Sequence, residues 1–307
     1  MSNKATGAPL HNPVPIGNVA NPHFAVLPDP QTLFGIRAAR LRQLAAEHQL
    51  GPYLNFLAGI ADAQHRLQEG LPEPEVPPPD ARERARQFNM PPIDRTRFVA
   101  EPAFDATLDR LLDFVADIEM PAQARAALEQ VKQADPAARD EMMRAVLADA
   151  IPVETLAHHV FVAAALQVHM ARVAARLDAT QLVAVGDALC PGCGSAPVAS
   201  VVVDWPQAPN TRYCACPLCQ TWWHYVRIRC TCCGTTKGIG YKEIENAPNG
   251  VQAETCEECH GYVKILNQRK YLQLDPVADD VATMGLDLLV REAGYRRGAI
   301  NPYLLGY

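Results

Sequence analysis

Eight of the ten cysteines in this 307-residue sequence are arranged as four Cys-x-x-Cys pairs. Two intervening residues allow one tight turn to direct both sulfurs of a pair at the same ion, and two such pairs complete a tetrahedral site of four thiolates. The sequence therefore predicts two four-cysteine metal sites, built from the pairs Cys190/Cys193, Cys216/Cys219, Cys230/Cys233 and Cys256/Cys259.

The four pairs are related by a tandem duplication. Adding 40 to positions 190, 193, 216 and 219 gives positions 230, 233, 256 and 259. Neighbouring residues follow the same rule, because Gly194 corresponds to Gly234 and Trp222 to Tyr262. If each copy closes its own site, the first site consists of Cys190, Cys193, Cys216 and Cys219, and the second of Cys230, Cys233, Cys256 and Cys259.

Other roles for these cysteines fit the sequence less well. A thioredoxin-type redox pair opens a helix within an alternating strand–helix pattern, which does not surround them. Iron–sulfur signatures place three cysteines close together with a remote fourth, whereas this two-plus-two arrangement favours mononuclear ions. Structural disulfides fit less well because they need an oxidising compartment. Cys214 and Cys232 have no counterpart in the other copy, and we interpret them as spare thiols near the sites.

The first part of the chain is predicted to be helical. Residues 1–28 carry proline, asparagine and glycine without periodicity and predict a loosely ordered arm. Between residues 29 and 185 apolar side chains recur at helical spacing, so we expect a helical domain there. Its helix starts are indicated by acidic–proline pairs such as Asp29–Pro30 and Asp135–Pro136. Five prolines within 71–80 predict an extended surface connector. The apolar segment Val153–Leu177 predicts a central buried helix.

From residue 186 the sequence changes to short β-like segments between turns. We expect a first rubredoxin-like four-cysteine domain at 186–226, a second at 227–274, and a C-terminal helix and tail at 275–307, the helix spanning 275–290. Domains of this size have too small a core to fold alone, so bound metal is expected to supply folding free energy. The predicted fold class is multidomain, with an all-helical N-terminal domain, two tandem rubredoxin-like or zinc-ribbon domains and a C-terminal helix.

Charge argues against nucleic acid as a partner. Residues 186–275 contain eight lysines and arginines and eight acidic residues, and the whole chain has a formal charge of −6. Four thiolates around a divalent ion add two further negative charges at each site. Since nucleic-acid-binding proteins present a basic surface, we expect no nucleic-acid partner.

The sequence also indicates no membrane insertion and no catalysis. No apolar run approaches the roughly 20 residues that span a bilayer, and no apolar signal-peptide core follows Met1, so we expect a cytoplasmic protein. There is no Ser/His/Asp set, phosphate-binding glycine loop or His-Glu-x-x-His motif. Four-cysteine sites are closed shells. We therefore predict no catalytic residues and a protein-binding role, and we interpret His158, His159 and His169 as satisfied or surface residues.

Four motifs together carry a family resemblance. They are Cys190-Pro-Gly-Cys193-Gly-Ser, Cys216-Pro-Leu-Cys219-x-Thr-x-Trp, Arg227-x-Arg-Cys230-x-x-Cys233-Gly and Gly294-Tyr-Arg-Arg-Gly-x-x-Asn-Pro-Tyr-Leu-Leu. This combination resembles the family of the formate dehydrogenase accessory protein FdhE over nearly the full chain. The resemblance implies one mononuclear ion in each rubredoxin-like domain, with iron favoured over zinc, and all eight paired cysteines as ligands.

The resemblance further implies a role in enzyme assembly. It predicts a cytoplasmic accessory factor that binds the immature catalytic subunit of respiratory formate dehydrogenase before that subunit is exported. From the residues alone, a rubredoxin-like electron carrier or redox sensor acting on a partner enzyme is the alternative hypothesis, because a four-cysteine site that holds iron can carry one electron.

Overall fold

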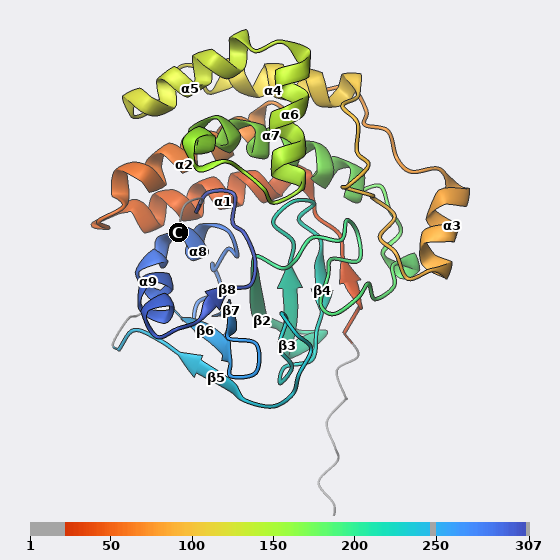
Figure 1. The fold of residues 1–307 in the computed structure, drawn as a ribbon, viewed down its shortest axis with the longest axis vertical. Coiled ribbons are helices and arrows are strands. Elements are labelled where there is room, and N and C mark those ends of the chain that lie inside the picture. Colours follow the sequence, from red (N-terminus) through yellow and green to blue (C-terminus); the bar gives the residue numbers. More distant parts are fainter. Residues whose placement is uncertain (1–21, 246–249, 305–307) are drawn as a thin grey trace, which may run out of the picture.

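The computed structural model describes residues 22–245 and 250–304, and it divides into a helical layer and a sheet (Figure 1). The helical layer precedes the sheet in the chain, which confirms the predicted order. Its α-helices are α1 (Pro30–Ala45), α2 (Gly51–Arg66), α3 (Pro79–Gln87), α4 (Pro102–Phe114), α5 (Ala122–Gln133), α6 (Pro136–Leu147) and α7 (Leu156–Ala174), with single 3₁₀ turns at Val153–Thr155 and Ala179–Gln181.

Helix α7 lies at the centre of the helical layer. Nearly every residue from Phe161 to Ala174 is buried, and α1, α2, α4, α5 and α6 all contact this helix. A helix that is apolar on all sides must be surrounded by other elements, so the predicted central helix is confirmed.

Two of the acidic–proline pairs, Asp29–Pro30 and Asp135–Pro136, begin helices for the expected reason, whereas Glu101 before Pro102 makes no capping bond in the described chain and its carboxylate accepts a hydrogen bond from the backbone N–H of Glu75. The Asp29 carboxylate accepts a hydrogen bond from the backbone N–H of Gln31, and Asp135 accepts one from Ala138. Both bonds satisfy N–H groups that a helix leaves free at its start. The proline-rich connector is extended up to residue 78, but its last two residues, Pro79 and Asp80, begin α3, so the predicted extended segment is wrong at this end.

The predicted N-terminal arm is partly a strand. Residues 1–21 of that arm lie outside the described residues. Strand β1 (Ala25–Val26) pairs antiparallel with β4, so the end of the arm is fixed to the sheet instead of loosely ordered. The prediction was wrong for these residues because a two-residue strand has no periodicity to detect.

The sheet consists of two copies of one antiparallel unit. Strands β2 (Ala199–Trp205), β3 (Ala208–Ala215) and β4 (Trp222–His224) form the first unit, and β5 (Ile239–Lys242), β6 (Val251–Cys256) and β7 (Gly261–Asn267) form the second. Strands β2 and β7 pair in parallel, which gives the order β1-β4-β3-β2-β7-β6-β5. The two copies therefore share one continuous sheet, and β8 (Arg296–Arg297) pairs with β7.

The C-terminal helix is broken, which differs from the single helix predicted at 275–290. Helix α8 (Ala278–Ala282) ends before Thr283, and α9 (Met284–Glu292) begins after it. The buried ammonium of Lys264 donates hydrogen bonds to the carbonyl oxygens of Asp280 (2.8 Å) and Thr283 (3.1 Å). A continuous helix would use these carbonyls internally, so the lysine stabilises the break. Among the described residues, no helix combines the length and apolar character needed to cross a membrane.

Candidate metal centres

The first candidate site brings together the sulfurs of the first two cysteine pairs. The Sγ atoms of Cys190 and Cys219 lie 3.5 Å apart, and those of Cys193 and Cys216 lie 3.4 Å apart. Backbone N–H groups of Leu218 and Cys219 point at the Cys216 sulfur from 3.4 and 3.3 Å. N–H donors of this kind stabilise a thiolate, which is the form of cysteine that binds a metal ion.

The second candidate site has the same arrangement forty residues later. The Sγ atoms of Cys230 and Cys259 lie 3.8 Å apart, as do those of Cys233 and Cys256. The sulfurs of each set of four all lie within 4.8 Å of one another. Four sulfurs at about 2.3 Å from one ion stand about 3.8 Å apart in a tetrahedron. Both sets fit that geometry, and each could hold one metal ion.

The turns that build these sites need left-handed backbone. Gly194 and Gly234, after the first pair of each copy, have φ of 77° and 73°. The equivalent positions after the second pairs have the same conformation without glycine, since φ is 61° at Gln220 and 51° at His260. A side chain in this region costs about 1–2 kcal/mol. The second pairs therefore form the same kind of turn as the first pairs, although no glycine follows them.

The two sites differ in exposure to solvent. All four cysteines of the first site are between 0 and 1 % exposed, and the hydroxyls of Ser195 and Thr221 lie 3.3 Å from two of their sulfurs. In the second site Cys233 is exposed and Cys259 is half-buried. Solvent and small molecules can therefore reach the second site directly, whereas the first is enclosed.

Burial affects the thiols of the first site strongly. Burial raises the pKa of Cys190 and Cys219 well above the ordinary value for a cysteine. Cys193 shows the opposite shift, because hydrogen bonds from the neighbouring thiols and Ser195 lower its pKa well below the ordinary value against the effect of burial. Four thiolates cannot be held in so dry a site without a cation, which is the chemistry of a closed metal centre.

The two remaining cysteines lie close to the sites. Burial raises the pKa of Cys214 to about 11, and its sulfur lies 3.7 Å from the Ser200 hydroxyl. Burial also raises the pKa of Cys232 to about 12. A Cβ atom at Gly298 would lie 2.2 Å from the Cys232 sulfur, so that glycine makes room for this thiol. High pKa values keep both thiols protonated and weakly nucleophilic at neutral pH.

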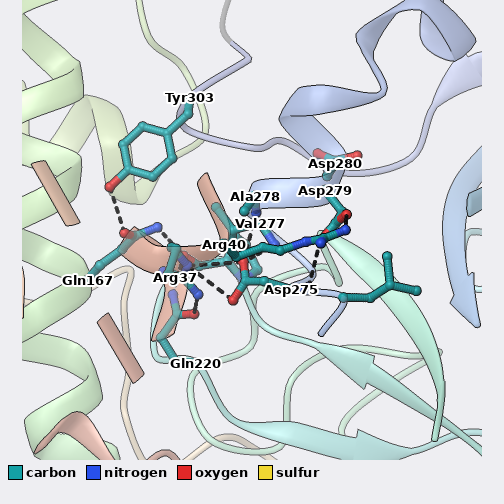
Figure 2. A network of polar contacts seen from close by, with 12 residues as sticks. Arg37, Arg40, Gln167, Gln220, Asp275, Val277, Ala278, Asp279, Asp280 and Tyr303 are labelled. Carbon is teal, nitrogen blue, oxygen red and sulfur yellow. Dashed lines mark hydrogen bonds and ion pairs between the residues drawn. The ribbon is translucent and has the colours of Figure 1, made fainter. Parts of the chain in front are cut away.

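A polar network connects the first site to the helical layer (Figure 2). Arg37 on α1 donates a hydrogen bond of 2.8 Å to the Gln220 side chain, directly after Cys219, and pairs with Asp275 at 3.2 Å. Gln167 on α7 donates to the carbonyl oxygen of Pro217 inside the second pair of that site. These residues could not be identified from the sequence, because a lone arginine or glutamine in a helix gives no signal of a distant partner.

The histidines of α7 differ in how they are satisfied. Nδ1 of His159 lies 2.7 Å from the carbonyl oxygen of Thr155, and His158 contacts Gln130. His169 is completely buried, and in the described part of the chain neither ring nitrogen has a hydrogen bond, although Nε2 pairs with Oε1 of Glu101 at 3.0 Å. His169 is therefore not a surface residue, and Glu101 is the polar partner that faces its ring. None of the three lies in a four-cysteine group.

The fold and the two sites define a helical protein joined to a duplicated four-cysteine ribbon. Family models for the FdhE N-terminal, central and C-terminal domains match residues 22–187, 189–227 and 228–304. The chain belongs to the FdhE family.

Similar proteins cover almost the whole chain. A protein FdhE homolog from Rhizobium meliloti (strain 1021) is 45 % identical over 96 % of this chain and 97 % of its own length. One from Stutzerimonas stutzeri (strain A1501) is 36 % identical over 93 % of each chain. The crystal structure of the FdhE protein from Pseudomonas aeruginosa is similar with a TM-score of 0.82 at 33 % identity, covering 92 % of this chain and 99 % of that one.

Proposed function

We propose that this protein is a cytoplasmic accessory factor for respiratory formate dehydrogenase, and that it binds the immature catalytic subunit before export. Membership of the FdhE family over nearly the full length carries the proposal. Two closed four-cysteine sites support a binding role in place of catalysis, because a catalytic metal keeps an open coordination position. Accordingly, we propose that the protein is not an enzyme.

The metal sites are proposed to organise the binding module. Cys190, Cys193, Cys216 and Cys219 would hold one ion, and Cys230, Cys233, Cys256 and Cys259 would hold the other. Iron is the favoured ion, with zinc as the alternative, since thiolates accept both. We propose that the chain is organised as a helical domain at 29–185, two rubredoxin-like domains at 186–226 and 227–274, and a C-terminal segment from 275.

Deletion of the gene tests the accessory role. Cells without this protein are expected to make the catalytic subunit of formate dehydrogenase but to show little enzyme activity. The wild-type protein should restore activity, whereas a Cys190→Ser variant should not, because its first site cannot close. Full activity in the deleted cells, with the subunit normally assembled, would contradict the proposal.

The exposed second site favours a second candidate function, a rubredoxin-like electron carrier or redox sensor. Electron transfer requires a metal within reach of the partner, and Cys233 and Cys259 meet this requirement better than the enclosed cysteines of the first site. Protein in which both ions are zinc separates the two functions, because zinc has no redox chemistry. Assembly supported by the zinc form would exclude the electron carrier, and assembly lost only in the zinc form would favour it.

A further inference from the structure

We propose that a positively charged pocket beside the second four-cysteine site binds the phosphate group of a small molecule. The pocket has a volume of about 390 Å³ and lies between α9 and β8. Strand β8 pairs with the start of β7, and α9 contacts β6 and β8, so the pocket belongs to the second copy (Figure 1). The inference goes beyond the proposed accessory function and does not depend on it.

A helix-ending motif builds the pocket. Gly294, with φ of 90°, donates to the carbonyl oxygen of Arg291 at 2.9 Å, and Tyr295 donates to that of Val290 at 3.2 Å. This pair of bonds is a Schellman motif, which reverses the chain after a helix. It also satisfies carbonyl oxygens at the end of α9, so these oxygens are not free to accept hydrogen bonds from the arginine side chains of the pocket. The reversed chain becomes β8, where Arg296 pairs with Gly261, two residues after Cys259.

One arginine of the pocket is already neutralised. Arg297 pairs with Asp280 and, at 2.7 Å, with Asp287. Asp287 also accepts a hydrogen bond of 2.8 Å from the Tyr262 hydroxyl and lies 2.5 Å from Nζ of Lys264. Two positive and two negative side chains thus balance one another in a buried cluster. Asp287 and Arg297 of this cluster line the pocket, and the cluster has no net charge left to bind a ligand.

Two further arginines at the pocket are exposed and unpaired. Among the described residues, the side chains of Arg291 and Arg296 have no hydrogen bond and no ion pair. Lys242 adds positive charge close by, with Nζ 5.1 Å from the centre of the Tyr295 ring. The nearby carboxylate of Glu257 accepts a hydrogen bond from the Tyr295 hydroxyl. The lining of the pocket therefore carries two arginine charges that no carboxylate of the described chain pairs with, in a chain whose formal charge is −6.

The charge and size of the pocket indicate the class of ligand. A phosphate monoester carries a charge of about −1.5 to −2 at neutral pH, which matches the two unpaired arginines. One guanidinium group can donate two parallel hydrogen bonds to two oxygens of a phosphate group. Pockets for small molecules begin at about 300 Å³, so this pocket has room for an organic group beside the phosphate. Leu288 and the rings of Tyr262 and Tyr295 line that remaining space.

Calorimetric titration of the full-length, metal-loaded protein with inorganic phosphate and with adenosine monophosphate tests the proposal. Both probes should bind, the nucleotide more tightly because it also covers the apolar wall. Arg291→Gln and Arg296→Gln should each weaken binding of both probes about tenfold. Arg84→Gln is the matched control, since Arg84 is an exposed arginine on α3, away from the pocket, and its side chain has no partner in the described chain.

Four outcomes would overturn the proposal. Neither probe binds at millimolar concentration. Arg84→Gln weakens binding as much as the pocket variants do, which would indicate non-specific attraction. A glutamate-rich peptide binds at the two arginines while phosphate does not, which would make the pocket a docking point for an acidic protein segment. Arg291→Gln and Arg296→Gln reduce the metal content but leave phosphate binding unchanged, which would assign the arginines to charge balance at the second site.

Discussion

Arg37 donates a hydrogen bond of 2.8 Å to the side chain of Gln220, the residue that follows the last cysteine of the first site. The same guanidinium pairs with Asp275 at 3.2 Å, and the Arg37 side chain is only 1 % exposed. One buried charge on α1 therefore contacts both the turn that presents Cys219 and the segment that leads into α8. The helical layer and the metal-binding ribbon are packed as parts of one structure at this point.

Removal of Arg37 is predicted to destabilise the protein strongly. Arg37→Ala leaves the buried carboxylate of Asp275 without its partner, and breaking a buried pair in this way costs about 3–5 kcal/mol. Arg42→Ala is the control, because Arg42 pairs with Asp62 while its side chain is 53 % exposed, and such pairs contribute at most about 1 kcal/mol. Urea denaturation of the metal-loaded variants measures both values. Equal effects of the two substitutions would contradict this role for Arg37.

The left-handed residues after the second cysteine pairs should respond differently to glycine. His260→Gly relieves backbone strain and is predicted to raise the free energy of unfolding by about 0.5 kcal/mol, after the entropy of glycine is subtracted. Gln220→Gly relieves the same strain but removes the hydrogen bond to Arg37, so we expect a net loss of about 1 kcal/mol. Thermal unfolding of the two variants in parallel distinguishes the positions, and a gain for Gln220→Gly would show that its contact is unimportant.

The ions of the two sites are predicted to leave at different rates. A chelator reaches the second site through the exposed Cys233 and half-buried Cys259, whereas the first site is enclosed. We expect one ion to be removed early and the other only with loss of tertiary structure. Metal release followed by absorbance, together with near-ultraviolet circular dichroism, tests this order.

Single cysteine variants provide the control for metal release. Cys233→Ser should lose the early phase and retain the helical layer, while Cys190→Ser should lose the late phase and unfold more easily. Simultaneous release of both ions from the wild-type protein would show that the difference in exposure has no kinetic consequence.

Acid is predicted to destabilise the protein through His169. Burial lowers its pKa to about 4, whereas an unfolded histidine titrates near 6.5. As the pH falls from about 6.5 to 4, the imidazole of His169 binds a proton in the unfolded chain but stays neutral in the folded chain. The free energy of unfolding therefore falls in this window, by up to about 3 kcal/mol. Burial raises the pKa of Glu101, which has the opposite effect, since that stability is lost as the pH rises above about 4.5.

A His169→Phe variant isolates the histidine contribution. Phenylalanine suits the site because Phe98 and Phe104 already contact the imidazole ring. The free energy of unfolding of the variant should vary less between pH 6.5 and 4 than that of the wild-type protein. Identical pH profiles would mean that His169 takes up a proton without cost in the folded state.

The grouping of the cysteines could be predicted because their signal is local and duplicated. Two residues between cysteines determine a turn, and the forty-residue repeat indicates which turns belong together. Helix starts such as Asp29–Pro30 were predictable for a similar reason, since capping involves neighbouring residues.

The features that the sequence did not reveal depend on contacts between distant residues. Arg37 and Asp275 are 238 positions apart, and the parallel pairing of β2 with β7 joins Ala199 to Lys264. The break between α8 and α9 depends on that same lysine, which comes from a strand and satisfies carbonyls in the helix. The spacing of apolar residues reflects only which side chains of a segment are buried. It therefore predicts a continuous helix over 275–290 and gives no sign of the lysine that stabilises the break.

Co-purification of the catalytic subunit with this protein would test the proposed binding directly. The tagged protein would be purified anaerobically from cells that make respiratory formate dehydrogenase, and the bound proteins identified by mass spectrometry. We expect recovery of the catalytic subunit with its export signal still attached. Recovery should be lost with Cys190→Ser and retained with Arg84→Gln. Absence of the subunit from the purified material, or recovery of only its mature exported form, would contradict the account.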